Sequence, residues 1–473
     1  MSLYDELTAY SASDAYPFHM PGHKRRTLSM QDPYSFDITE IDGFDDLHHP
    51  SGILLEAQER AAALYHSEET HFLVNGSTAG VLSAICASVP SGGLLLMARN
   101  SHRCAYHAAS LRNIRTRYLY PEMQGPLNGP ILPETVERAL RGPGAEKPDA
   151  IFLTSPTYDG VVSDVEAIAK IAHHSGVPLI VDEAHGAHFG MHPAFPPSSV
   201  SLGADLVIHS LHKTLPALTQ TALLHVNGTL ADRGKLRRML SVFQTSSPSY
   251  VLMASIDSCI GYLAENRDTF FSEYTKRLER FRAQAHFQHM DLPRTDDPSR
   301  ILLFPSHMSA PRLYDLLRDR YHLQPEMLAP EYVLMLSSAS DSEEGLTRLL
   351  EALRELDRTG EGPDGQDIPD TGRPSARPEE TGVFDLRARA RFPLSCSFDA
   401  AQEEISWDAC EGAVSAEYLY LYPPGIPLLA PGEVITGQVR RCADDLTRAG
   451  FRLQGTADPS HRMIRIIKED TPK

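Results

Sequence analysis

The stretch PLIVDEAHGAH at residues 178–188, together with ADLVIHSLHKT at residues 204–214, decides the predicted fold. Each stretch contains a short apolar run rich in Leu, Ile and Val, which is typical of a strand buried inside a sheet. Each run then ends directly in polar and titratable side chains. A helical pattern over residues 165–174 precedes the first run, which indicates successive βα units of a parallel sheet.

The same alternation extends outward from this region. Apolar runs alternate with segments whose apolar residues recur at helical spacing. The pattern therefore predicts an α/β fold with a mostly parallel sheet and helices on both of its faces. The predicted strands are 71–74, 93–98, 150–153, 178–181 and 205–209, and the predicted helices are 78–87, 133–141 and 165–174, with another beginning near Gly52.

The flanking segments differ in composition from this central region. The first fifty residues show little helical periodicity and are rich in His, Pro, Gly and Asp, and the stretch Pro17–Arg26 within them is predicted to be an ordered loop. A later segment is dense in Pro, Gly and charge and cannot bury enough apolar surface to order itself, which indicates a linker. The predicted units are an N-terminal segment (1–50), a large domain (51–265), a smaller α/β domain (266–358), a linker (359–381) and a C-terminal domain (382–473).

Composition narrows the class of protein. The chain has 473 residues and a net charge of −18, from 62 acidic and 44 basic residues. A nucleic-acid-binding protein would normally present a basic face, so that class is disfavoured. The six cysteines form no C-x-x-C pair, which argues against a zinc or redox site and fits a reducing compartment. No signal peptide or membrane-spanning run is visible, so a cytoplasmic protein is expected.

Three of the predicted strands end in chemically suggestive residues. Asn75-Gly76-Ser77-Thr78 follows the first strand, Asp182 ends another, and Lys213 follows a third. Ligands of an open parallel sheet bind outside the carboxyl ends of its strands. All three groups are therefore expected to face one crevice.

The Gly-Ser-Thr turn opens a predicted helix. Its backbone N–H groups, its two hydroxyls and the positive end of the helix dipole would suit an anion. The alternative is that Ser77 or Thr78 is an ordinary helix N-cap. The motif alone does not separate these two interpretations.

Asp182 and Lys213 suggest a cofactor site. A carboxylate at a strand end can bond a cationic ring nitrogen, although an N-cap or a metal ligand is the alternative. The metal interpretation is poor, because only His185 and His188 lie nearby, and no metal is expected. Lys213 lies 31 residues after Asp182, about one βα unit. An arbitrary lysine is usually a surface residue, but a strand-end lysine paired with an Asp is the arrangement that holds pyridoxal phosphate (PLP).

Longer motifs carry a family resemblance. The chain resembles the fold-type I PLP decarboxylases of the ornithine, lysine and arginine group, in the shorter bacterial form without the N-terminal wing domain. The motifs keep the family order and cover nearly the whole chain. They are PFHMPGHK (17–24), DDLHHPSGILLEAQ (45–58), FLVNGSTAG (72–80), ARNSHRCAYHA (98–108), SPTYDGV (155–161), VDEAHGAH (181–188), SLHKTLPALTQ (210–220), QTSSPSY (244–250) and AEYLYLYPPGIPLLAPGE (416–433).

The resemblance implies an aspartate-aminotransferase-like fold around a seven-stranded sheet, and a role for each matching residue. Lys213 is implied as the Schiff-base lysine and Asp182 as the partner of the pyridine nitrogen. His102 is implied to stack on one face of the cofactor ring, and Ala184 to pack on the other. The remaining implied contacts are Ser77, Thr78, Ser210 and His212 at the phosphate, Thr245 from the partner subunit, and His185 at the phenolic oxygen.

The implied reaction is decarboxylation of a basic amino acid to its amine, and arginine, lysine and ornithine stay open. A desolvated ammonium or guanidinium needs an acidic or aromatic partner. Glu40, Asp45 and Glu417 are the candidate substrate contacts, although an acidic run is more often a solvated loop. The pair His23-Lys24 is also expected near the active site, with an ordinary loop role as the alternative.

Two alternatives stay open on sequence grounds, because fold does not fix reaction type. Another fold-type I PLP enzyme, an aminotransferase or lyase, would be favoured by an arginine clamp for the substrate carboxylate. A non-catalytic regulatory paralogue would have lost Lys213 or Asp182, and both are present. The resemblance also implies at least a homodimer, since fold-type I enzymes usually build each active site from two subunits.

Overall fold

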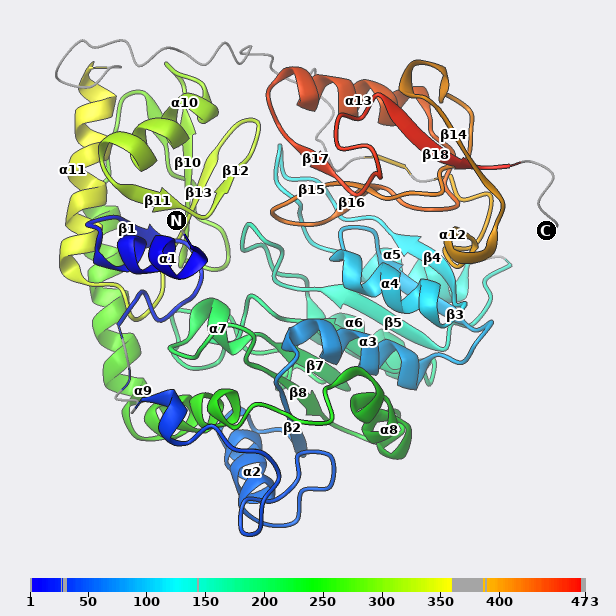
Figure 1. Cartoon of the computed structure of the whole chain (residues 1–473), viewed down its shortest axis with the longest axis horizontal. Coiled ribbons are helices and arrows are strands. Elements are labelled where there is room, and N and C mark those ends of the chain that lie inside the picture. Colours follow the sequence, from blue (N-terminus) through cyan, green and yellow to red (C-terminus); the bar gives the residue numbers. More distant parts are fainter. Residues whose placement is uncertain are drawn as a thin grey trace.

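The computed structural model describes residues 2–26, 28, 32–142, 144–359, 386–387 and 389–468. Figure 1 shows how the elements of these ranges are arranged. The predicted linker lies outside the described residues, apart from Thr359 at the end of α11 (Glu343–Thr359). Within the described ranges, no helix has both the length and the apolar character needed to cross a membrane.

A seven-stranded sheet forms the largest layer of the molecule (Figure 1). Its strands are parallel except for β8, which runs antiparallel to its neighbours β2 and β7. This arrangement confirms the predicted mostly parallel sheet. The strands, in spatial order, are β2 (Glu69–Leu73), β8 (Ala222–Val226), β7 (Leu206–His209), β6 (Leu179–Asp182), β5 (Ala150–Thr154), β3 (Leu94–Ala98) and β4 (Arg115–Leu119).

Helices cover both faces of this sheet. Successive strand residues point to opposite sides, so they pack against different helices. Phe152 and Ile180 pack with residues of α3, α4 and α8, whereas their neighbours Ile151 and Val181 pack with residues of α5 and α6. Helices α5 and α6 have the bounds that the periodicity predicts. The helices around this sheet are α2 (Ile53–Tyr65), α3 (Gly76–Ser88), α4 (Arg103–Leu111), α5 (Pro133–Arg141), α6 (Val165–His174), α7 (Leu211–Thr214) and α8 (Arg233–Phe243).

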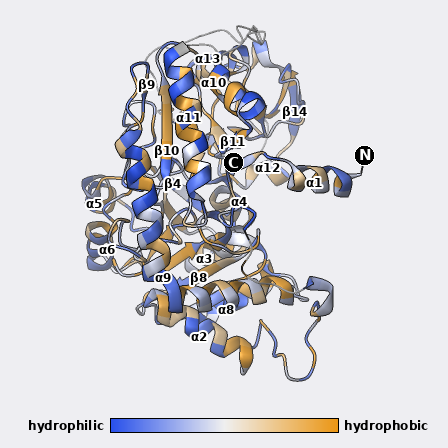
Figure 2. Cartoon of the chain, turned by 90° about the vertical axis from the view of Figure 1, so that its left-hand side faces the viewer, coloured by the Kyte–Doolittle hydropathy of each residue, from blue (hydrophilic) through white to orange (hydrophobic). Residues whose placement is uncertain are grey.

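The long helix α9 (Tyr250–Gln284) leads to a second, four-stranded sheet. Leu278 and Phe281 of α9 share one core with Ile301 and Leu303 of β10. Figure 2 shows the hydrophobic strand β10 beside α9 and α11, whose ribbons carry many hydrophilic residues. The elements of this part are β12 (Met327–Leu328), β13 (Val333–Leu336), β10 (Arg300–Pro305) and β9 (Met290–Asp291) in spatial order, with α10 (Ala310–Asp315), η2 (Leu316–Arg320) and α11.

The N-terminal segment joins this smaller unit. Strand β1 (Tyr16–Phe18) pairs in parallel with β11 (Leu323–Pro325), and a short 3₁₀ turn, η1, spans Pro33–Ser35. Helix α1 (Leu3–Ala12) was not expected from periodicity, and none of its residues is buried. It projects from the body of the molecule in Figure 2. A capping box between Ser2 and Asp5 starts it, and this local signal needs no apolar stripe.

The C-terminal part packs against α4 and the end of β3. Arg99 Nη2, just after β3, lies 3.2 Å from Glu433 Oε2, and both side chains are buried. Tyr106 of α4 contacts Tyr418 edge to face. The domain boundaries named above stay predictions. The elements of this part are α12 (Cys396–Asp399), β14 (Gln402–Ser406), η3 (Trp407–Ala409), β15 (Leu419–Leu421), β16 (Pro427–Leu429), α13 (Gly437–Arg448), β17 (Leu453–Gln454) and β18 (Met463–Ile467).

Candidate active site

The carboxyl ends of β2, β6 and β7 open into one pocket of about 590 Å³. Parallel strands end at the same edge of a sheet, so the polar residues that follow them come together there. Asp182, Lys213 and Ser77 all line this pocket, as the sequence predicts for their strand ends. The N-terminal segment, the smaller unit and the C-terminal part also contribute to its wall, through Met20, Glu326 and Tyr422 respectively.

Lys213 lies in the single turn of α7 that follows β7. Its Nζ is 2.9 Å from His185 Nε2. Burial lowers the pKa of the Lys213 amine, although the carboxylates of Asp182 and Glu326 act in the opposite direction. A lowered pKa increases the neutral fraction of an amine, which is the form that attacks a carbonyl carbon.

Asp182 is the last residue of β6 and is only 6% exposed. Its Oδ1 accepts a hydrogen bond from Ala184 N at 3.1 Å. Burial raises the pKa of this carboxyl, and the charge of Lys213 only partly opposes the effect. A cationic group bound beside Asp182 would restore its ionised form, since an opposite charge favours it.

His102 caps the start of α4 and lines the same pocket, as does Ala184. Its Nδ1 accepts from Cys104 N at 3.3 Å. Burial, and then the charge of Lys213, lowers the pKa of His102 to about 3, so the ring is neutral. Gly425 adopts φ +81°, and a Cβ there would lie 3.2 Å from the His102 ring. The C-terminal part therefore packs closely on this ring because a glycine stands at that position.

The N-terminus of α3 offers an anion site. The N-cap is Asn75, which makes no side-chain capping bond, so the interpretation of Ser77 or Thr78 as the cap is wrong. Ser77, Thr78 and His212 all line the pocket beside this helix end. Burial lowers the pKa of His212 to about 4, which leaves a neutral ring whose Nδ1 bonds the carbonyl of Thr221. Backbone N–H groups and hydroxyls at a helix start suit a phosphate.

Unpaired buried polar atoms support a polar ligand here. Among the described residues, Asn100 Oδ1 and Thr154 Oγ1 are buried, lack a hydrogen-bond partner and belong to residues that line the pocket. Ser210 Oγ is also buried and unpaired, although Ser210 does not line the pocket. Buried polar atoms normally find partners. The residues present therefore fit a phosphorylated, cationic aromatic cofactor.

Thr245 is exposed and lies outside the pocket of its own chain. Its N–H donates to Asn75 Oδ1 at 3.1 Å, and its carbonyl bonds His48 Nε2 at 2.8 Å. Thr245 is thus bonded to the N-cap residue of α3 and remains exposed to solvent in the single chain. Its implied contact with a partner subunit's cofactor stays a prediction.

The three acidic residues named as substrate contacts lie outside the pocket of the single chain. Glu40 is exposed. The carboxylate of Asp45 accepts from the backbone of Ser51, Gly52 and Leu54 and so holds the start of α2. Glu417 accepts from Ala457 N at 2.8 Å and Arg465 N at 3.0 Å. Asp45 and Glu417 therefore have local structural roles here.

Lys24, of the PGHK motif, is buried but does not line the pocket. Its Nζ donates to the carbonyls of Pro17, His19 and Leu336 at 3.1, 3.0 and 2.6 Å. These bonds join the N-terminal segment to the end of β13. For Lys24 the structure thus shows a structural role.

Sequence reasoning missed a second acidic residue that lines the pocket beside Asp182. Glu326 lies between β11 and β12, where it accepts from Tyr158 OH and, at 2.8 Å, from Met20 N. Tyr158 belongs to the quoted motif SPTYDGV, but nothing in the local pattern marks Glu326. Arg103 also lines the pocket, where it bonds Tyr420 OH and lies over the rings of Tyr420 and Tyr422.

PLP enzymes pair a Schiff-base lysine with a carboxylate for the ring nitrogen. This pocket places both at the strand ends of the matching sheet, which defines a fold-type I PLP-dependent enzyme. Comparison with known proteins narrows the assignment. The model of the Orn/Lys/Arg decarboxylase major domain matches residues 1–301, and that of the C-terminal domain matches residues 394–449. The chain therefore belongs to the Orn/Lys/Arg decarboxylase family and is a PLP-dependent amino-acid decarboxylase.

Individual relatives agree with this assignment. An arginine decarboxylase of Halalkalibacterium halodurans is 31% identical over 99% of this chain and 97% of its own length. The uncharacterized protein YaaO of Bacillus subtilis is also similar, at 32% identity over 99% of this chain and 98% of its own length. Among solved structures, the Francisella novicida lysine decarboxylase LdcF has a TM-score of 0.75 at 18% identity, covering 98% of this chain and 80% of that chain. This last likeness shows the fold.

Proposed function

We propose that the chain decarboxylates a basic amino acid, with arginine as the substrate. The observation that carries the proposal is that Glu326 places a carboxylate in the same pocket as Lys213 and Asp182. Relatives named arginine decarboxylase match over nearly their whole length, which supports arginine over lysine.

The two charged residues at the strand ends act on the cofactor. When bound, PLP supplies an electron sink for the pair released from the Cα–carboxylate bond. Lys213 would hold the cofactor through its amine. Asp182 would hold a proton on the ring nitrogen, and its buried position would strengthen that charge-assisted bond.

The remaining cofactor contacts orient the ring. Ser77, Thr78, His212 and the N-terminus of α3 hold the phosphate. His102, neutral and covered by the loop at Gly425, restricts the tilt of the ring and excludes water. Lys213 Nζ would carry the proton that is delivered to the substrate Cα.

Glu326 receives the side-chain cation of the substrate. One of its oxygens accepts from Tyr158 and the other from Met20 N, so the carboxylate is held in place before the substrate binds. A planar guanidinium matches such a carboxylate geometrically. Arg103 already donates a hydrogen bond to Tyr420 OH, so we do not propose that it binds the substrate carboxylate.

The test is a product assay of the PLP-loaded enzyme with arginine, lysine and ornithine in parallel. We expect agmatine and carbon dioxide in equal amounts, with the highest kcat/KM for arginine. A higher kcat/KM for cadaverine or putrescine formation would overturn the choice of arginine. Transamination of the substrate without release of carbon dioxide would overturn the reaction itself.

We also propose a homodimer in a reducing compartment such as the cytoplasm, on the polyamine pathway. Exposed Thr245 beside Asn75 supports a subunit interface at the pocket rim, and all six cysteines are free. Light scattering should give twice the 52.3 kDa of one chain. A monomer with full activity would exclude a shared active site.

A further inference from the structure

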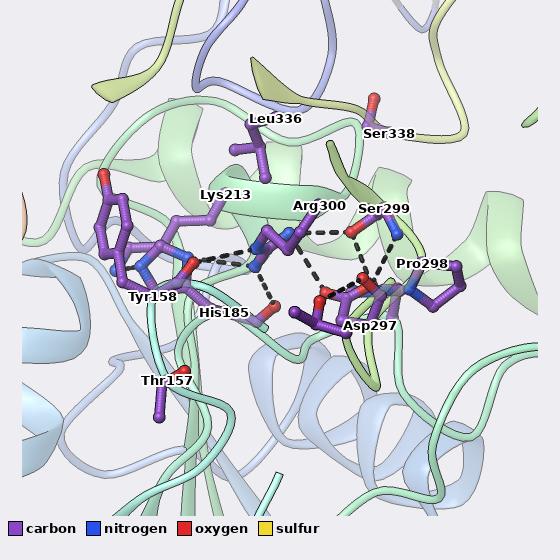
Figure 3. Close-up of polar contacts among 12 residues, drawn as sticks. Thr157, Tyr158, His185, Lys213, Asp297, Pro298, Ser299, Arg300, Leu336 and Ser338 are labelled. Carbon is purple, nitrogen blue, oxygen red and sulfur yellow. Dashed lines mark hydrogen bonds and ion pairs between the residues drawn. The ribbon is translucent and has the colours of Figure 1, made fainter. Parts of the chain in front are cut away.

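A buried polar cluster lies on the side of His185 opposite Lys213 (Figure 3). Its centre is Arg300, the first residue of β10, whose side chain is fully buried. The guanidinium Nε donates to Tyr158 O at 3.2 Å, and Nη1 donates to Ser299 Oγ at 2.8 Å. Nη2 contacts His185 twice, at the carbonyl oxygen (3.1 Å) and at Nδ1 (3.3 Å). Arg300 does not itself line the pocket.

Asp297 holds this guanidinium from the other side. Its Oδ2 lies 3.2 Å from Arg300 Nη1, with both side chains fully buried. Its Oδ1 accepts from Ser299 Oγ at 2.6 Å and bonds His188 Nε2 at 3.2 Å. Burial raises the pKa of Asp297, but Arg300 and His188 outweigh it and hold the pKa well below its usual range. The positive charge of Arg300 is therefore balanced by Asp297, and these contacts fix the position of the guanidinium.

The contact between Arg300 and His185 determines where the imidazole carries its hydrogen. A guanidinium has only donors, so His185 Nδ1 must accept. Burial, then Lys213 and Arg300, lowers the pKa of His185 well below its ordinary value, so the ring is neutral. A neutral imidazole that accepts at Nδ1 carries its hydrogen at Nε2. That Nε2 is the atom 2.9 Å from Lys213 Nζ.

We propose that Arg300 is a positioning residue for Lys213: it fixes the His185 tautomer so that Nε2–H donates to the Lys213 nitrogen. The donated hydrogen favours the neutral amine. In the other tautomer Nε2 would be an acceptor and would favour the ammonium. Arg300 also pairs with Leu336 of β13, so its contact with His185 links the smaller sheet to Lys213. This positioning role rests on the proposed role of Lys213.

The test measures how the apoenzyme captures PLP at different pH values. In this step the neutral amine nitrogen of Lys213 bonds the aldehyde carbon, and its two hydrogens leave with the carbonyl oxygen as water. The pH midpoint of the capture rate therefore reports the pKa of the amine. We expect Arg300→Gln to raise this midpoint by about one pH unit, the equivalent of one net hydrogen bond.

A double-mutant cycle separates positioning from direct charge. In a His185→Gln background, Arg300→Gln should leave the midpoint almost unchanged if it acts through His185. The same shift in both backgrounds, or no shift in the single variant, would overturn the proposal. Arg282→Gln is the matched control, because Arg282 Nη2 donates to Pro298 O and Arg300 O but His185 is not among its contacts. We expect it to lower the melting temperature without moving the midpoint.

Arg300→Lys covers the case in which Arg300→Gln does not fold. Its single nitrogen keeps the ion pair with Asp297 but gives up the bond to His185 Nδ1, so the midpoint should rise in the same direction. An unchanged midpoint in a folded Arg300→Lys would contradict the proposal. Peptide mapping of the captured cofactor in the unsubstituted enzyme identifies the lysine used. Capture at a lysine other than Lys213 would refute the proposed function instead.

Discussion

The floor of the pocket and its opposite wall are built differently. The floor consists of residues at or shortly after the carboxyl ends of strands of the seven-stranded sheet, such as Asp182 and Lys213. The wall combines Met20, Glu326 and Tyr422 from three distant segments. The groups for cofactor chemistry are therefore encoded locally, whereas those for substrate choice depend on how separate units pack.

The largest effect is expected on the floor, at Lys213. Lys213→Ala removes both the anchor of the cofactor and the proposed proton donor, and kcat should fall by about 10²–10⁴-fold. The visible absorbance of the covalently held cofactor should vanish with it. Retention of that absorbance would show that another amine holds PLP and that the floor is wrongly assigned.

The wall should act on substrate binding. Glu326→Gln leaves the substrate cation without its buried partner, which costs about 2–5 kcal/mol. We expect kcat/KM to fall at least about thirtyfold, mainly through KM, while cofactor absorbance is unchanged.

Glu331→Gln is the control, because Glu331 is an exposed carboxylate close to Glu326 in the sequence, between β12 and β13. It should have the kinetic constants of the unsubstituted enzyme. Equal effects of the two substitutions would remove the distinction between floor and wall.

Asp182→Asn should reduce kcat by about 10- to 150-fold, the value of one charge-assisted hydrogen bond of about 1.5–3 kcal/mol. The amide keeps the shape of the floor but not its charge, so PLP should still bind. Steady-state kinetics with an absorbance spectrum of the same sample checks both statements. An unchanged kcat would remove Asp182 from the mechanism.

The smallest effect concerns the pH dependence of stability. His102 has a pKa near 3 in the folded chain and an ordinary value of 6.5. Between these values the unfolded chain binds a proton that the folded chain does not, so stability falls as the pH falls. At pH 5 the effect is at most about 2 kcal/mol.

His102→Asn removes this titration and keeps a side-chain acceptor for Cys104 N. Thermal unfolding of the apoenzyme at pH 7 and pH 5 should therefore show a smaller decrease for the variant, by a few degrees. Equal decreases would mean that His102 is not a buried neutral ring.

The sequence predicts the central sheet and its floor well, because the signals there are local. Apolar runs mark the strands, and the bounds of α5 and α6 agree with helical periodicity. Helix α1 was not predicted, because it buries no apolar stripe and depends on the Ser2 capping box. The N-cap of α3 is Asn75 rather than Ser77 or Thr78.

The wall could not be predicted in the same way. Acidity alone pointed to Glu40, Asp45 and Glu417, yet the carboxylates of Asp45 and Glu417 are satisfied by nearby backbone N–H groups. Glu326 faces the pocket only because the turn between β11 and β12 packs against Met20 and Tyr158. Such contacts join residues far apart in the chain, and periodicity carries no information about them.

The most direct measurement is reduction of the PLP-loaded enzyme with borohydride, followed by peptide mapping. Reduction makes the bond between the cofactor and its lysine permanent. We predict one phosphopyridoxyl group per chain, on Lys213. Its recovery on Lys24, the buried lysine outside the pocket, or on any other lysine would contradict the assignment of the active site.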